Sequence, residues 1–316
     1  MIYILGTGGN MPTKYRQTLS IFVNYMGKGI LFDAGENTQR QMRLLNLSPT
    51  QIDYIFLTHI HGDHILGLPG ILLSLSNQDY NRELTIFGPK GIKEVIEKII
   101  DSFAININFP LKIKEIGETK IDFGPFYIES IYGIHQVPVL AYSFKEKDKI
   151  KINKEKLAKY NIRSNPKLAK LKEGKSVTIN GITLDPKEFT YIQKGLKFTL
   201  ITDTLFREQF IDFARDSDII FHELAFLDKD KDKAIEHYHS TISDAFRIRD
   251  ESNSKLLVFI HVSPRYQGSL FEIYQYLYNK KDWIIAEDLD YIEYKKGTII
   301  YKRNDIVLYE YAIWRS

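Results

Sequence analysis

The sequence contains Ile52-Asp53-Tyr54-Ile55-Phe56-Leu57-Thr58-His59-Ile60-His61-Gly62-Asp63-His64, an apolar run that leads directly into a cluster of imidazole and carboxylate side chains. The apolar run predicts a buried strand that ends at the cluster. His59 and His61 are two residues apart and can point the same way, whereas Asp63 and His64 fall where a following helix begins. Imidazole and carboxylate groups suit zinc, and the chain has no cysteine to compete with them. The spacing therefore predicts that one short segment serves two metal ions.

Length and composition indicate a folded α/β protein. The chain has 316 residues, of which 44% are hydrophobic and 13% aromatic, so it can bury a sizeable core and is not disordered throughout. The N-terminus lacks the basic flank and apolar region of a signal peptide. The longest apolar segment, residues 65–75, is short and is interrupted by glycine and proline. We therefore expect a cytoplasmic protein with no membrane span.

Positive charge is concentrated in one part of the chain. Residues 145–175 contain 12 Lys or Arg against 4 Asp or Glu, a local net charge of +8, which leaves −5 for the rest of a chain whose total is +3. Such a run is either a solvated face or a surface that binds phosphate groups. Within it, Asn165 and Pro166 precede good helix formers and Gly174 follows them, which predicts a short basic helix. We expect this arm, residues 145–194, to bury little apolar surface and to be the most mobile part of the chain.

The rest of the chain alternates predicted strands and helices, and more metal-binding residue types follow the strands. His135 lies in a β-rich region, 111–144, which suits an antiparallel sheet. Asp203, His222 and His261 each come at the end of an apolar run. Residues 268–316 predict one helix and a β-rich tail. Strands are predicted at 2–5, 19–24, 30–32, 84–87, 197–201, 218–221 and 256–260. Helices are predicted from after residue 39 to about 45, at 65–76 and 89–100, and from about 242.

Taken together, these motifs resemble the tRNA 3′-processing endonuclease family (tRNase Z, short form) of the metallo-β-lactamase superfamily. The resemblance covers nearly the whole chain. Asn37 stands where the family commonly has glycine, a difference that Asn tolerates because it can adopt the left-handed conformation. The arm has Asn165-Pro166-Lys167 where a Gly-Pro cluster is expected. The motifs that carry the resemblance are Pro12-x-Lys14-x-Arg16, His59-x-His61-x-Asp63-His64, His135, Asp203, His222-Glu223-Leu224-Ala225, His239-Ser240-Thr241 and His261-x-Ser263-x-Arg265-Tyr266.

The resemblance implies an αββα sandwich of two mixed sheets flanked by helices. It also implies a domain formed by residues 1–144 and 195–316, interrupted by the basic arm at 145–194. Two Zn²⁺ ions per chain are expected, with Mn²⁺ or Fe²⁺ as alternatives. His59, His61 and His135 would hold one ion, Asp63, His64 and His261 the other, and Asp203 would bridge them.

The implied activity is removal of the 3′ trailer from precursor tRNA, which leaves a 3′-hydroxyl on the tRNA. Asp63 would accept a proton from the attacking water, and His239, oriented by Glu223, would protonate the leaving oxygen. Structural roles are expected for His222 and His237, and an orienting role for Asp33. Neither DNA nor a membrane is an expected partner, and the family forms homodimers whose arm grips tRNA that is cut on the other subunit. The expected substrate contacts are Lys14, Arg16, Lys154, Lys156, Lys159, Arg163, Lys167, Lys170, Lys172, Ser240, Thr241 and Arg265.

Two other classes of function remain open at the level of sequence. A small-molecule metallo-hydrolase of the glyoxalase II (thioesterase) type would share the metal ligands but would need neither a basic arm nor His239. A non-catalytic RNA-binding protein of the same superfamily would be expected to have lost ligands, and none is missing from this sequence.

Overall fold

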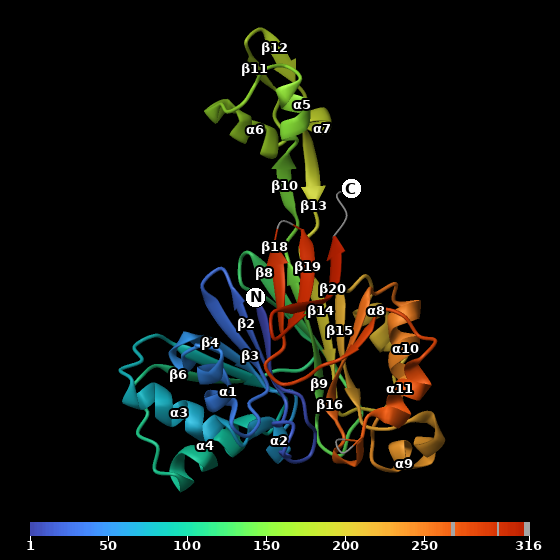
Figure 1. Ribbon diagram of the computed structural model, residues 1–316. Helices are drawn as coiled ribbons and strands as arrows, with labels where there is room; N and C mark the ends of the chain where they lie inside the picture. Colours follow the sequence, from blue (N-terminus) through green and yellow to red (C-terminus); the bar gives the residue numbers. More distant parts are fainter. Residues whose placement is uncertain (267–268, 296, 313–316) are drawn as a thin grey trace.

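Two β-sheets packed face to face form the body of the protein, with helices on both outer faces and an arm that projects from one end (Figure 1). The structure is a computed structural model that describes residues 1–266, 269–295 and 297–312. In the described chain, the first sheet has the strand order β20 (Ile306–Ala312), β19 (Thr298–Arg303), β18 (Tyr291–Lys295), β1 (Ile2–Gly6), β2 (Ser20–Tyr25), β3 (Lys28–Phe32), β4 (Ile52–Phe56), β5 (Leu84–Gly88) and β6 (Leu111–Glu115).

The second sheet is also mixed. Its order is β17 (Trp283–Ile285), β16 (Leu256–Val262), β15 (Ile219–Leu224), β14 (Lys197–Ile201), β9 (Leu140–Glu146), β8 (Phe126–Tyr132) and β7 (Thr119–Asp122). Strands β3 to β6 run parallel to one another, and so do β14 to β17. Parallel strands bring their C-terminal ends to one edge of a sheet, which is where loops can assemble a site.

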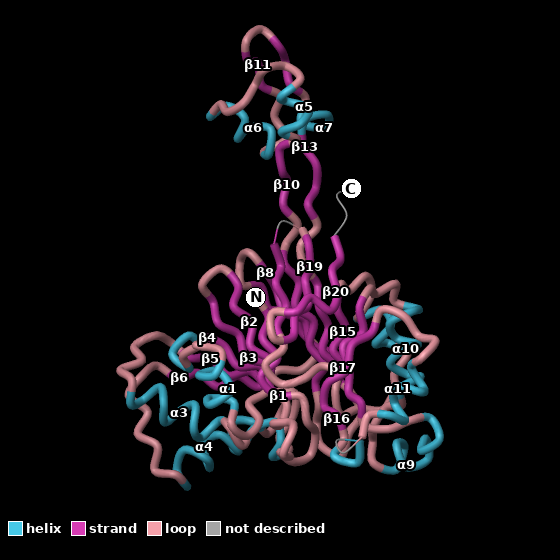
Figure 2. Tube along the Cα trace, viewed as in Figure 1, coloured by secondary structure: helices cyan, strands magenta, loops and turns pink. Residues whose placement is uncertain are grey.

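Apolar side chains fill three layers between and around the sheets. Phe32 and Phe56 of the first sheet pack with Phe144 and Phe198 of the second in the central layer. The second layer lies under helices beside the first sheet and the third under helices beside the second (Figure 2). The helices of the body are α1 (Thr38–Leu44), α2 (Gly62–Ile65), α3 (Leu68–Asn77), α4 (Ile92–Ser102), α8 (Gln209–Phe213), α9 (Lys231–Glu236), α10 (Ile242–Glu251) and α11 (Phe271–Leu277). The predicted αββα architecture is confirmed.

The arm stands on a two-stranded stalk. Lys149 pairs with Gln193 at its base and Ile152 with Thr190 at its top. The side chain of Asn165 accepts a hydrogen bond from the backbone N–H of Lys167, as its predicted capping role requires. From N- to C-terminus the arm consists of β10 (Lys149–Ile152), α5 (Lys154–Ala158), a 3₁₀ turn (Pro166–Leu168), α6 (Ala169–Lys172), β11 (Val177–Ile179), β12 (Ile182–Leu184), α7 (Pro186–Phe189) and β13 (Thr190–Gln193).

Two sequence-based expectations about the fold were wrong. Strand β6 pairs in parallel with β5 in the first sheet, because α4 crosses between them as in a βαβ unit, whereas only β7 to β9 form the expected antiparallel run. The arm also buries more apolar surface than expected. Its own small core consists of Leu157, Ile162, Leu168, Leu171, Val177, Ile179, Leu184 and Phe189.

Two further observations concern the backbone of Asn37 and the length of the helices. Asn37 has a φ of 64°, so it adopts the left-handed conformation expected where a glycine is common. Among the described residues, no helix combines the length and the apolar character needed to cross a membrane.

Candidate metal centre and catalytic pocket

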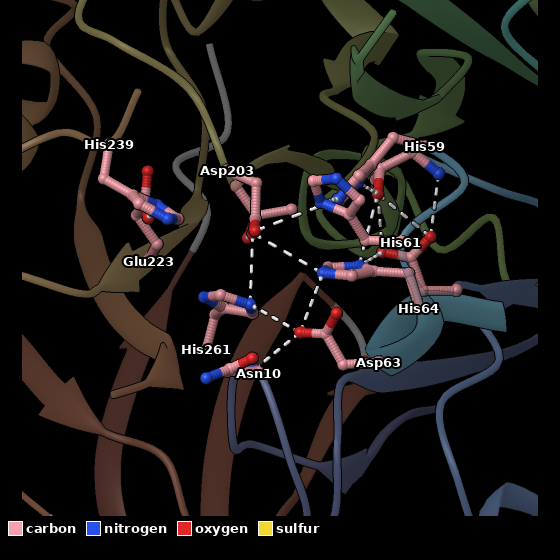
Figure 3. Close-up of polar contacts among 12 residues, drawn as sticks. Asn10, His59, His61, Asp63, His64, Asp203, Glu223, His239 and His261 are labelled. Carbon is pink, nitrogen blue, oxygen red and sulfur yellow. Dashed lines mark hydrogen bonds and ion pairs between the residues drawn. The ribbon is translucent and has the colours of Figure 1, made fainter. Parts of the chain in front are cut away.

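The predicted ligands converge at the edge of the sandwich where the parallel strands end. The loop after β4 and helix α2 supply His59, His61, Asp63 and His64, while other loops and strands bring in the remaining ligands. In Figure 3, Asp203 lies between the side chains from the first sheet and those from the second. Candidate ligand atoms form one group in His59, His61, His135 and Asp203 and another in Asp63, His64 and His261, with the atoms of each group within 4.8 Å of one another. These His and Asp groups are able to bind metal ions.

Three imidazoles lie beside Asp203 in the first group. Nε2 of His59 lies 3.0 Å from Nδ1 of His61, which in turn lies 3.2 Å from Nε2 of His135. Nδ1 of His135 lies 3.2 Å from the carbonyl oxygen of Tyr238. Because a carbonyl only accepts, Nδ1 carries the proton and Nε2 presents a lone pair to the group. Burial lowers the pKa of all three imidazoles, and of His59 most clearly, so the rings are neutral and suited to bind a cation.

Carboxylates and imidazoles face each other in the second group. Nε2 of His261 lies 3.1 Å from Asp63 Oδ2 and 3.2 Å from Asp203 Oδ1. Nε2 of His64 is fully buried and lies 3.4 Å from Asp63 and 3.5 Å from Asp203, yet it is hydrogen-bonded to neither. A buried polar atom without a partner costs free energy, and a metal ion at this point would satisfy it. The donor set therefore fits a cation, with Asp203 placed between the two groups.

Other groups hold these ligands in place. Asp33 accepts hydrogen bonds from Nδ1 of His64 at 2.8 Å and from the backbone N–H of Thr58 at 2.7 Å, which fits the orienting role predicted for it. The backbone N–H of Asn10 donates to Asp63 Oδ2 at 2.6 Å. Burial alone would raise the pKa of Asp63, but His64 and His261 outweigh it and hold that pKa below its usual range.

Glu223 and His239 form a second polar unit beside the metal groups. Oε2 of Glu223 lies 2.5 Å from Nδ1 of His239, and Oε1 accepts from the backbone N–H groups of Thr204 and Ser240 at 3.1 and 3.3 Å. Both carboxylate oxygens are therefore occupied, although Glu223 also lies within ligand range of Asp203 and His261. Burial alone would lower the pKa of His239, but the carboxylate of Glu223 outweighs it and raises that pKa to about 9.

One pocket of about 550 Å³ connects these features. Its wall contains residues of both metal groups, His239 and, among other side chains, Phe226, His237 and Arg265. His239, whose pKa is raised, and a set of candidate metal ligands thus open onto the same space.

The structure places the predicted substrate contacts unevenly. Lys14, Arg265 and the seven arm residues predicted to contact the substrate are exposed, as contact with RNA requires. Arg16 is buried and donates to Thr7 Oγ1 at 2.6 Å and to the carbonyl of Ala286, so the expectation of a direct substrate contact is corrected. The same correction applies to two buried hydroxyls. Ser240 donates to the carbonyl of Thr204 at 2.6 Å, and Thr241 caps α10.

The sequence did not reveal several of the groups that shape the site. Asn10 and Tyr238 act through their backbones, which no side-chain pattern reports, although the Gly-rich loop next to Asn10 was a signal of close approach. A Cβ atom at Gly9 would lie 2.5 Å from the ring of His261. His222 is buried with Nδ1 3.0 Å from the carbonyl of Glu223, in keeping with a structural role, whereas exposed His237 lies on the pocket wall.

Comparison with known proteins agrees with this geometry. Residues 13–136 match the family described as the Metallo-beta-lactamase superfamily. The chain is 40% identical to "Ribonuclease Z" of Methanocaldococcus jannaschii, over 94% of this chain and 98% of the relative, and 36% identical to "Ribonuclease Z" of Thermococcus kodakarensis, over 94% and 96%.

Solved structures show the same fold. The human tRNase Z short form superposes with a TM-score of 0.66 at 24% identity, over 91% of this chain and 96% of that one. A metallo-beta-lactamase fold protein from Bacillus subtilis gives 0.65 at 16% identity, over 91% and 96%. The sequence relatives extend over nearly the full length of both chains, and on that basis this chain belongs to the ribonuclease Z family.

Proposed function

We propose that this protein is a zinc-dependent endoribonuclease that removes the 3′ trailer from precursor tRNA and leaves a 3′-hydroxyl on the tRNA. The observation that carries the proposal is the 2.5 Å contact between Glu223 and His239 on the wall of the pocket that holds the metal-binding residues. A proton donor in this position would protonate a leaving group that departs as an alkoxide oxygen.

The chemistry divides between the two halves of the pocket. Two zinc ions, held by His59, His61 and His135 and by Asp63, His64 and His261, with Asp203 shared, would lower the pKa of a water molecule and neutralise charge on the phosphate. Asp63, whose pKa is held low, remains able to accept a hydrogen bond from the attacking water.

His239 works on the opposite side of the reaction. Its raised pKa, about 9, keeps the ring protonated at neutral pH, so it can donate a proton to the leaving 3′-oxygen. Glu223 then stabilises the position of the ring through Nδ1, which leaves Nε2 to act as the donor.

The arm supports a role in binding a long RNA. In Figure 1 it rises from the end of the sandwich opposite to α2, which carries two of the metal-binding residues. Its exposed cations, among them Lys154, Lys156, Lys159, Arg163, Lys167, Lys170 and Lys172, suit the phosphate backbone. An arm that points away from its own pocket would grip a tRNA cut on another subunit, so we include a homodimer in the proposal, together with a cytoplasmic location.

A thioesterase of the glyoxalase II type is not favoured by the ribonuclease Z relatives or by the exposed basic arm. The decisive experiment offers the metal-loaded protein a precursor tRNA with a 3′ trailer and, separately, a glutathione thioester. We expect cleavage of the RNA at the trailer junction with a 3′-hydroxyl on the tRNA fragment, and no thioester hydrolysis. The opposite preference would overturn the proposal, and binding of the RNA without cleavage would favour a non-catalytic role.

A further inference from the structure

Three planar side chains form a stack on the wall of the pocket. Phe226 contacts both of the other side chains and is buried, with an exposed fraction of 3%. The guanidinium carbon of Arg265 lies 4.1 Å from the Phe226 ring centroid. The ring of His237 lies 10° from parallel to Phe226, with centroids 6.2 Å apart. Arg265 and His237 are both exposed, so the stack shows planar groups to the space of the pocket.

The stack is held firmly on its inner side. The carbonyl of Phe226 accepts a hydrogen bond from the backbone N–H of Ile242 at 3.1 Å, which ties it to the first turn of α10. Nε of Arg265 donates to Ser263 Oγ at 3.1 Å, which fixes the plane of the guanidinium. A fixed cation over an aromatic ring, beside an imidazole, is a surface on which another flat π-system can stack.

We infer that this stack is a binding platform for the base of the last tRNA nucleotide, the one whose 3′-oxygen leaves. The inference rests on the proposed function and assigns a substrate subsite to the same pocket. Bases of single-stranded RNA stack on aromatic and guanidinium planes with little regard to their identity. Such a platform would place the nucleotide without restricting cleavage to one base.

The position of His239 indicates that the stacked base belongs to the last tRNA nucleotide and not to the first nucleotide of the trailer. Its ring lies 5.8 Å from the ring of Phe226, and it follows His237 by two residues. In an in-line displacement the attacking water and the leaving oxygen lie on opposite sides of the phosphorus. Figure 3 shows His239 and Glu223 on one side of Asp203, and Asp63 with His64 on the other. The stack is therefore on the side of the acid, where the leaving nucleotide must lie.

The test uses the full-length, metal-loaded protein and three precursor tRNAs: the intact RNA, one with an abasic ribose at the last tRNA position, and one with an abasic ribose at the first trailer position. Loss of one stacked base costs about 5- to 150-fold in affinity. We expect the first abasic substrate to raise KM by a factor in that range and the second to change KM by about two-fold or less.

Variants of the stack test whether it is the cause of this rise in KM. His237→Ala removes one planar group, and Arg265→Lys keeps the positive charge but removes the plane, so each should shrink the KM ratio of abasic to intact RNA. His237→Phe keeps a ring and should retain the ratio. Glu236→Ala, an exposed neighbour outside the pocket lining, is the matched control and should behave like the parent on all three RNAs.

Two results would overturn the inference: an unchanged KM ratio in both His237→Ala and Arg265→Lys, or a larger penalty for the abasic trailer than for the abasic tRNA position. Thermal melting of each variant checks that the fold is intact. Failure of the proposed function has a different signature, because the parent protein would then leave the intact precursor tRNA uncut, and the inference would fall with it.

Discussion

Tyr238 adopts a φ of 59°, and its carbonyl oxygen lies 3.2 Å from Nδ1 of His135. A left-handed conformation is costly for a residue with a side chain, so the surrounding structure must impose it. The same loop between α9 and α10 presents His239 one residue later. A single turn of backbone therefore orients a predicted metal ligand and positions the predicted acid.

Substitutions at Tyr238 should distinguish the role of its backbone carbonyl from that of its side chain. Tyr238→Gly should keep the carbonyl in place and relieve about 1 kcal/mol of backbone strain, because glycine adopts a positive φ freely. Tyr238→Pro fixes φ near −65° and should turn the carbonyl away. Loss of the hydrogen bond that orients a ligand typically lowers metal affinity about 10- to 100-fold. Competition with a zinc chelator measures this affinity, and equal affinities for the two variants would contradict the orienting role.

Metal content should follow the two groups of ligands. Protein purified without chelators should contain about two zinc ions per chain, as expected of a two-metal site. His135→Ala removes a ligand from the first group alone, whereas Asp203→Ala removes the residue placed between both groups. Elemental analysis should show a smaller loss of zinc for His135→Ala than for Asp203→Ala. A parent protein without metal, or activity that survives chelator treatment, would count against a metal centre.

A methyl group at Gly9 should disturb the second metal group. The new Cβ would lie 2.5 Å from the ring of His261, far inside van der Waals contact, so the ring must move. We expect Gly9→Ala to lose zinc and activity while the protein stays folded. Gly62→Ala, at the first residue of α2, is the control, because its Cβ would meet only the flexible side chain of Leu66 at 3.1 Å. Similar zinc content in Gly9→Ala and the parent would show that His261 is not needed to hold an ion.

The pH dependence of kcat should report the Glu223–His239 pair. Because Glu223 raises the pKa of His239 to about 9, the ring stays protonated up to higher pH, and kcat should fall only as the pH rises through that pKa. Glu223→Gln removes the negative charge, which should lower the pKa and move the alkaline fall to lower pH. His239→Ala should remove this fall and lower kcat by about 10²-fold or more, with KM nearly unchanged. An unshifted profile in Glu223→Gln would rule out His239 as the acid that this profile reports.

The resemblance carried by the motifs predicted the sandwich and the set of converging residues, and the apolar runs that end in His or Asp predicted that these residues follow strands. The sequence could not report backbone conformation. Asp33, Asp203 and His261 all have positive φ values, 55°, 51° and 47°, at the ends of strands, and neither composition nor spacing reveals this strain.

Contacts between segments far apart in the sequence explain why the expectations about Arg16 and the arm were wrong. Arg16 was expected to contact the substrate, but it is buried and donates hydrogen bonds to Thr7 and to the carbonyl of Ala286, which is 270 residues away. The apolar residues of the arm lie in short segments among charges. Val177, Ile179, Ile182 and Leu184 alternate as in a β-hairpin, but the sequence does not show that this hairpin packs with the helices of the arm into one core. The stack of Phe226, His237 and Arg265 likewise joins separate segments, which the spacing of these residues along the chain does not show.

The last prediction is that the arm supplies affinity for tRNA and contributes nothing to hydrolysis. Because the arm has its own core and its stalk strands pair from Lys149–Gln193 to Ile152–Thr190, residues 153–189 can be replaced by a two-residue Asn-Gly turn that closes the hairpin. The sandwich should remain folded and keep its metal. KM for precursor tRNA should rise strongly, and its salt dependence should flatten, because each lost phosphate contact removes about 0.7 to 0.9 from the slope of log affinity against log salt. Hydrolysis of bis-p-nitrophenyl phosphate, which is too small to reach the arm, should continue at the parent rate. Equal losses on both substrates would mean that the arm supports the pocket itself, and its role as an RNA clamp would have to be given up.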